Sequence, residues 1–97
     1  MKQSIWKYPL QPAEAKDGHL GQMVFEIEMP QRSEVLTVQV QNNVPTLWAV
    51  VWTELPKLKR RIEVYGTGHE CESMGRKYIS TFQLNEGRLV FHAFEAP

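Results

Sequence analysis

The chain has 97 residues, which is enough for one domain with one hydrophobic core. Hydrophobic residues make up 42% and charged residues 23%, a globular composition that excludes a disordered tail. Eleven basic side chains balance eleven acidic ones, which argues against a nucleic-acid-binding protein because such proteins are normally basic. No apolar run is long enough for a membrane helix, no signal peptide is visible, and one cysteine cannot form an internal disulfide. We therefore expect a single cytoplasmic domain over residues 1–97.

Apolar and polar residues alternate along most of the chain, a pattern that predicts strands buried on one face. In the first half, strands are expected over residues 6–10, 23–29 and 36–41. The first two are separated by a loop over residues 11–22, with room for one helical turn. Asn42 and Asn43 predict a tight turn, because asparagine tolerates positive φ.

The second half continues the pattern after a strand at 44–52 that is apolar on both faces. Further strands are expected over residues 61–66, 78–84 and 89–94. A glycine-containing loop is expected over 66–76, and Asn85–Gly87 predicts a three-residue hairpin connection. Short strands with closely spaced turns predict an all-β fold, a single small antiparallel sandwich or partly open barrel of six to seven strands.

Trp48 and Trp52 carry the most informative functional signal. They share one face of the 44–52 strand, while Leu47, Ala49 and Val51 occupy the other. A domain of this size cannot easily cover both faces of the strand. One face therefore packs in the core, and the other is either further core or a contact surface. Tryptophan is enriched at binding hot spots, which favours a partner-binding or self-association surface.

A basic run lies at Lys57–Arg61 and is interpreted as a loop that steers an acidic partner toward the protein. The predicted partner-binding residues are therefore Trp48, Trp52, Lys57, Lys59, Arg60 and Arg61. The loop from Gly66 to Arg76 is expected to contribute to the same surface.

The alternative is a binding protein, or sponge, for a small anion or nucleotide. Two glycines in Gly66–His69 allow a sharp turn that can present N–H groups to an anion, although Glu70 and Glu72 follow. The ligand-binding residues in this interpretation are Gly66, Thr67, Gly68, His69, Arg76 and Lys77, with Arg60 and Arg61 as further candidates.

Catalysis and metal binding have weaker support. Cys71 and His69 could meet in one loop, but a nucleophile–base pair needs a third group that orients the base. Three histidines and one cysteine are too few for a convincing zinc site. We expect no catalytic residues, no metal and no cofactor.

Several segments together resemble a family of small uncharacterised proteins from bacteriophages, prophages and bacterial genomes. The segments are Ile5–Leu10, Ile27–Pro30, Val38–Gln41, Pro45–Ala49, Tyr65–His69, Tyr78–Gln83 and Leu89–His92. Residues 11–22 are longer than the usual connection. The resemblance implies a phage setting, in which small accessory proteins bind and block a host factor. The expected function is therefore a non-enzymatic protein that engages a host protein, such as a defence-system component, and that forms a homodimer through a strand edge or the tryptophan-bearing face.

Overall fold

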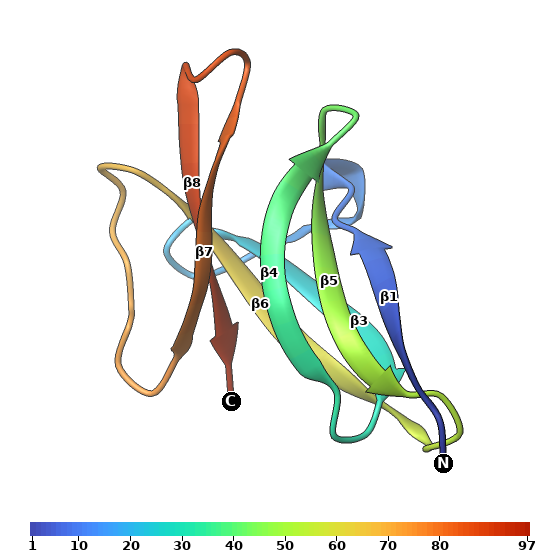
Figure 1. Ribbon diagram of the computed structural model, residues 1–97. Helices are drawn as coiled ribbons and strands as arrows, with labels where there is room; N and C mark the ends of the chain where they lie inside the picture. The colour runs from blue at the N-terminus through green and yellow to red at the C-terminus, as the bar shows by residue number, and fades with distance from the viewer.

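The computed structural model describes all residues 1–97 and is an all-β fold of two antiparallel sheets (Figure 1). Sheet A has the strand order β1-β5-β4 and sheet B the order β2-β3-β6-β8-β7. The elements are β1 (Gln3–Pro9), the 3₁₀ turn η1 (Pro12–Glu14), β2 (Lys16–Asp17), β3 (Met23–Pro30), β4 (Glu34–Gln41), β5 (Val44–Trp52), β6 (Lys57–Gly66), β7 (Lys77–Leu84) and β8 (Leu89–Ala96).

The predicted all-β class and the antiparallel sandwich are confirmed, and the sheets do not close into a barrel. The structure has eight strands rather than six or seven, because it contains the additional strand β2, which has only two residues. The 44–52 strand has its predicted bounds, and Asn42 and Asn43 have φ of 50° and 65°, as the predicted tight turn requires.

Two predictions about local structure are corrected. Lys57–Arg61 is not a loop, because β6 begins at Lys57 and pairs with β3 along its length, from Lys57 opposite Pro30 to Val64 opposite Met23. The basic run is therefore a strand because it hydrogen-bonds to β3, and this pairing could not be predicted from the residues of the run alone. The connection between β7 and β8 has four residues rather than three, since Leu84 pairs with Leu89.

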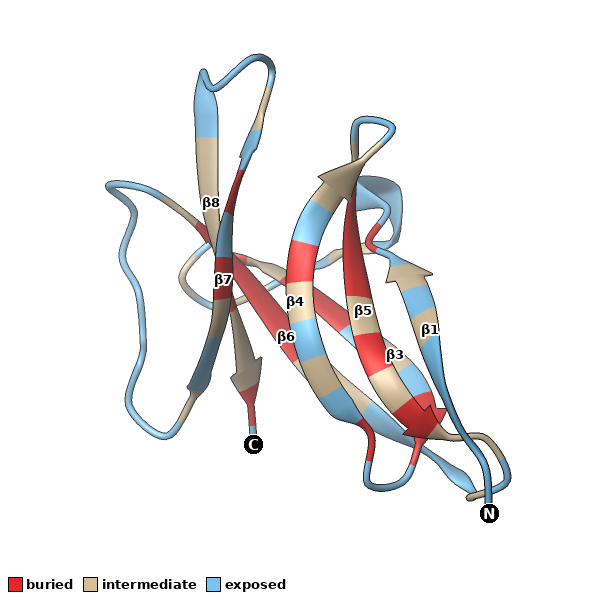
Figure 2. Cartoon of the chain, in the orientation of Figure 1, coloured by how far each residue is buried: buried red, intermediate tan, exposed pale blue.

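The hydrophobic core fills the space between the sheets. Its side chains come from alternate positions of the strands, as period-two patterning requires. Figure 2 shows buried residues alternating with half-buried ones along β5. The core consists of Leu10, Phe25, Met29, Val38, Leu47, Ala49, Val51, Ile62, Val64, Phe82 and Ala93.

The two sheets approach one another at β4 and β7 without a backbone–backbone hydrogen bond between them. The Ser80 hydroxyl bridges the gap. It donates to the Val38 carbonyl at 2.7 Å and accepts from the Val38 N–H at 2.8 Å. One side chain therefore satisfies both backbone groups of a residue that is fully buried.

Candidate functional site

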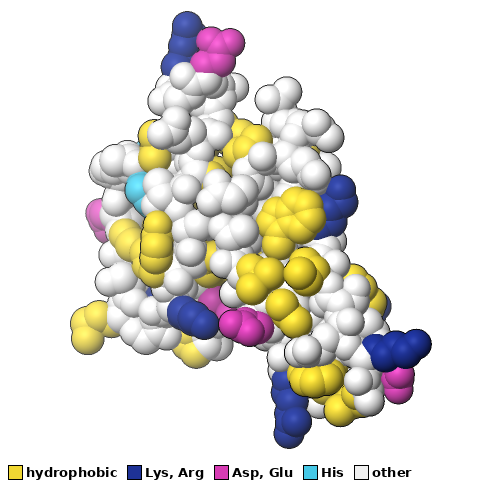
Figure 3. Space-filling view, viewed as in Figure 1, with side chains coloured by type: hydrophobic (Ala, Val, Ile, Leu, Met, Phe, Trp, Pro, Cys, Tyr) yellow, Lys and Arg dark blue, Asp and Glu magenta, His cyan; other side chains and the backbone are white.

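The outer face of sheet A carries a group of apolar side chains that no other part of the chain covers. On β5, Leu47, Ala49 and Val51 are fully buried, whereas the outward-facing Trp48, Val50 and Trp52 are only half-buried. Figure 3 looks onto this side and shows hydrophobic side chains gathered over the strands of sheet A. We call the surface formed by Ile5, Leu36, Trp48, Val50 and Trp52 the tryptophan face.

The neighbouring strands extend the tryptophan face on both sides of β5. Ile5 on β1 pairs with Val50 and is 62% exposed. Leu36 lies in the bulge of β4 between Val35 and Thr37, where Thr37 pairs with Trp48, and is 45% exposed. A run of apolar side chains across three strands is the kind of patch that marks an interaction site on a small protein.

Trp48 is held in place from one side. The Lys7 ammonium lies 5.9 Å from the centroid of the Trp48 ring and donates a hydrogen bond to Gln41 Oε1 at 2.9 Å. The lysine therefore contacts the ring face by a cation–π interaction while its own position is fixed from β4. An ordered aromatic side chain loses less conformational entropy when a partner binds it.

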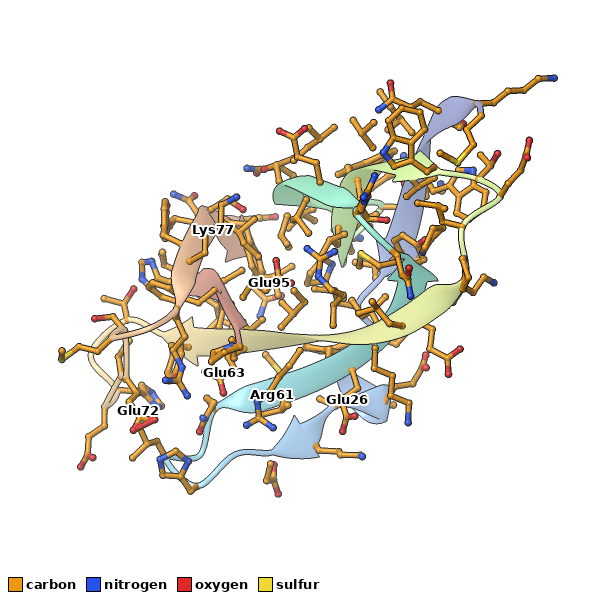
Figure 4. The ribbon with its side chains drawn as sticks, turned by 90° about the horizontal axis from the view of Figure 1, so that it is seen from below. Glu26, Arg61, Glu63, Glu72, Lys77 and Glu95 are labelled. Carbon is orange, nitrogen blue, oxygen red and sulfur yellow. The ribbon has the colours of Figure 1, made fainter.

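The basic run does not form one surface, because alternate residues of β6 point to opposite sides of sheet B. Arg60 is directed inward and forms a bidentate ion pair with Glu95, and it also donates to the Ser33 carbonyl at 2.9 Å. Arg61 lies on the outer side of sheet B and donates to Glu63 at 2.9 Å. Figure 4 shows Arg61 and Glu63 on one side of β6 and Glu95 on the other. Both arginines are therefore engaged within the chain.

Lys57 and Lys59 are exposed and make no ion pair. Of the four predicted basic contact residues, these two remain available to attract an acidic surface. Lys59 lies on the outer side of sheet B with Arg61, away from the tryptophan face on sheet A. The structure does not join the two tryptophans and the whole basic run into one patch.

A buried carboxylate organises the outer side of sheet B, and the sequence analysis did not single it out. Glu63 is fully buried and accepts hydrogen bonds from Arg61, from Arg76 at 2.8 Å and from the Tyr65 hydroxyl at 2.9 Å. Burial alone would raise the pKa of Glu63, but the hydrogen bonds from Arg76, Arg61 and Tyr65 outweigh it and lower the pKa to about 2. Glu63 is therefore ionised throughout the neutral range.

Arg76 anchors the loop between β6 and β7, residues 67–76, on sheet B. Besides Glu63, it pairs with Glu72 of the same loop at 3.2 Å. Glu72 in turn lies 3.5 Å from His19 in the loop between β2 and β3. Arg76 is thus committed to internal ion pairs, which raise its pKa and leave it little capacity for a ligand.

Gly66–His69 turns away from the end of β6. The Thr67 N–H donates to the Val90 carbonyl at 3.1 Å, and the His69 N–H donates to the Gly66 carbonyl at 3.2 Å. Gly68 has φ of 89°, which explains a glycine at that position. The Thr67 hydroxyl also lies 2.6 Å from His92 Nε2, so the turn is fastened to β8.

A cleft of about 450 Å³ lies beside this turn, where three connections meet at one end of sheet B. Gly66, Thr67 and His69 line it, whereas Gly68 lines a smaller hollow of about 240 Å³ on the other side of the turn. Arg76 and Lys77 line neither. Arg88, which the sequence analysis did not single out, lines the larger cleft and takes part in none of the ion pairs.

His69, Cys71 and His92, the groups that could support catalysis or metal binding, line the smaller hollow together but form no catalytic pair or metal cluster. Cys71 is exposed, and no hydrogen bond joins it to His69. No group of three or more histidine, cysteine, aspartate or glutamate side chains is placed to hold a metal ion. The strands account for nearly all of the regular structure, and no helix has the length and apolarity that a membrane crossing requires.

Comparison with known proteins identifies a family for the chain but adds no information about its function. No curated protein matches the chain, and no solved structure matches it. The family described as "Domain of unknown function (DUF7352)" matches residues 1–97. The chain therefore belongs to this uncharacterised family over its whole length.

Proposed function

We propose that the protein is a non-enzymatic binding protein that docks on another protein through the tryptophan face. The observation that carries the proposal is the partial exposure of Trp48 and Trp52 on a strand whose opposite face is fully buried. Large aromatic side chains presented by a stiff scaffold supply most of the binding energy at protein interfaces. Lys59 lies on the outer side of sheet B and is therefore not part of this contact surface.

The resemblance to phage and prophage proteins supports a host protein as the partner. Binding through a flat face of three strands would block that protein by occupying its surface, with no chemical step. A component of a defence system fits this proposal, because blocking such a component requires only tight occupancy. The mechanism needs no cofactor and no movement within the β scaffold.

The test compares capture of host proteins by the wild-type chain and by Trp48→Ala/Trp52→Ala. The retained protein is identified by mass spectrometry, purified and titrated by calorimetry. Loss of two aromatic anchors should raise Kd at least about 100-fold, since each hot-spot residue contributes about 2 kcal/mol or more.

The matched control is Tyr78→Ala, which removes an aromatic side chain that is 54% exposed on the outer side of sheet B. This variant should bind the same protein with wild-type affinity. Equal weakening by the tyrosine and tryptophan variants, or no weakening by the latter, would contradict docking through the tryptophan face.

A second candidate function, binding of a small anionic molecule, is favoured by the cleft beside Gly66–His69. Its volume of about 450 Å³ lies in the range of small-molecule sites, and the unpaired Arg88 lies on it beside an apolar wall that includes Phe91. An anion that carries an apolar or planar group would fit this combination.

Native mass spectrometry of the protein purified from its host tests this second candidate. If the cleft holds a ligand, the wild-type chain carries an added mass that is lost on denaturation. Arg88→Ala should remove that mass because the site loses its cation, whereas Lys77→Ala, which alters a cation outside the cleft, should retain it. A bare wild-type chain, or an added mass that survives Arg88→Ala, would count against the site.

A further inference from the structure

The free edge of β1 has a defined set of unpaired backbone groups. The Leu10 N–H donates to the Pro45 carbonyl at 2.7 Å, and the Thr53 N–H donates to the Lys2 carbonyl at 3.1 Å. Both bonds continue the antiparallel register of β1 with β5, in which Gln3 lies opposite Trp52. Hydrogen-bonded pairs alternate in such a ladder, so the even-numbered residues of β1 bond to β5. The N–H and C=O groups of Gln3, Ile5 and Lys7 therefore point away from β5.

This edge carries few of the features by which sheets usually protect their margins, Lys7 and the terminal Pro9 being the two exceptions. Prolines, bulges, inward charges and very short strands all discourage edge pairing. β1 has seven residues and no bulge, and its only proline, Pro9, is its last residue. By contrast, β4 at the other margin of sheet A carries a bulge and is bridged to β7 by Ser80.

We propose that β1 pairs with β1 of a second copy of this chain, antiparallel and centred on Ile5. In this register Gln3 lies opposite Lys7 of the second copy, Ile5 lies opposite Ile5, and Lys7 lies opposite Gln3. Each of these three pairs can exchange two N–H···O bonds, because all three residues direct both backbone groups to the free edge. The arrangement has twofold symmetry, the commonest symmetry of soluble oligomers.

Other registers are less favourable for reasons visible in the strand itself. A shift by two residues in one direction places Gln3 opposite Pro9, which has no N–H to donate. The opposite shift places Lys7 opposite Met1, which lies outside β1. Centring on Lys7 would oppose two like charges. The register on Ile5 also covers a side chain that is 62% exposed in the single chain.

The pairing would join the two copies of sheet A into one six-stranded sheet of order β4-β5-β1-β1-β5-β4. The outer side of that sheet would carry two tryptophan faces side by side. The dimer does not depend on the proposed partner protein, because its hydrogen bonds use the backbone edge of β1, and Ile5 alone belongs to both surfaces. A host protein with twofold symmetry could then engage both copies at once.

Sedimentation velocity over about 1 μM to 1 mM protein tests the pairing, because self-association depends on concentration. The wild-type chain should shift from 11.3 kDa toward twice that mass. Ile5→Lys and Ile5→Glu should each raise the dissociation constant at least about tenfold, because each places like charges opposite one another at the twofold axis. An equimolar mixture of the two variants should restore a dimer, since lysine then faces glutamate.

Two further variants separate the edge from the face. Leu36→Lys adds a charge to the tryptophan face on β4 and should leave the dimer intact. Ile5→Pro removes the edge-facing N–H of residue 5 while sparing every bond to β5, and it should weaken the dimer. A wild-type chain that stays at 11.3 kDa throughout, a dimer lost in Leu36→Lys, or failure of the Ile5→Lys and Ile5→Glu mixture to associate would overturn the proposal.

Discussion

Replacing Glu63 by glutamine should lower the free energy of unfolding by about 3 kcal/mol at neutral pH. The substitution keeps the size of the side chain but removes the charge that Arg61 and Arg76 both contact. Arg76 is only 17% exposed, so it would be left partly buried without a full counter-charge. The glutamine amide also presents N–H groups toward a guanidinium, so not all three former donors can find an acceptor.

Urea unfolding followed by tryptophan fluorescence measures this loss. Glu70→Gln is the matched control, since Glu70 is an exposed carboxylate of the same loop and makes no ion pair. Its effect should stay within about 0.5 kcal/mol, as for most surface substitutions. A Glu63→Gln chain as stable as the wild type would mean that the ion pairs do not outweigh the cost of burying the carboxylate.

The same carboxylate should make the protein sensitive to acid. The folded-state pKa of Glu63 is about 2, below its ordinary value of 4.5, so the folded state binds this proton less readily than the unfolded state does. The contribution to stability is therefore complete above about pH 5 and declines as the pH falls from there toward 2, by about 3 kcal/mol in total. Urea midpoints measured between pH 7 and pH 3 should fall for the wild type and much less for Glu63→Gln.

The strands that the sequence predicts well are those whose own residues alternate. The bounds of β5 are predictable because the segment from Val44 to Trp52 is apolar except for Thr46, with Pro45 and Pro56 near its two ends. The first half of β6 was missed, since Lys57–Arg61 contains one apolar residue and its strand conformation depends on pairing with β3. A two-residue strand such as β2 has no periodicity to detect.

The candidate site was predictable where it depends on one strand and not where it depends on several. Period two places Trp48 and Trp52 on one face, as the structure confirms, but it does not determine which face of the strand meets the core. The same rule separates Arg60 from Arg61, but it applies only because Lys57–Arg61 is strand and not loop. The burial of Glu63 could not be predicted from the residues next to it in the sequence, because one of its two arginine partners is thirteen residues away in a loop.

Replacing Ser80 by alanine should lower the free energy of unfolding by about 2 kcal/mol, although it removes a single oxygen atom. That oxygen satisfies both the N–H and the carbonyl of Val38, which is fully buried. Alanine would leave both groups without a protein partner at the gap between β4 and β7. Ser73→Ala is the control and should change stability little, because Ser73 is exposed and its hydroxyl makes no hydrogen bond.

Amide hydrogen exchange distinguishes loss of this bridge from a general weakening of the fold. In the wild type the Val38 N–H should exchange slowly, because its acceptor is a buried hydroxyl. In Ser80→Ala it should exchange much faster than the Leu47 N–H, whose residue pairs with Val38 inside sheet A. Parallel acceleration of both amides would mean that the sheets unfold together. Selective acceleration at Val38 would show that the Ser80 hydroxyl protects this amide locally, at a place where no backbone bond joins β4 and β7.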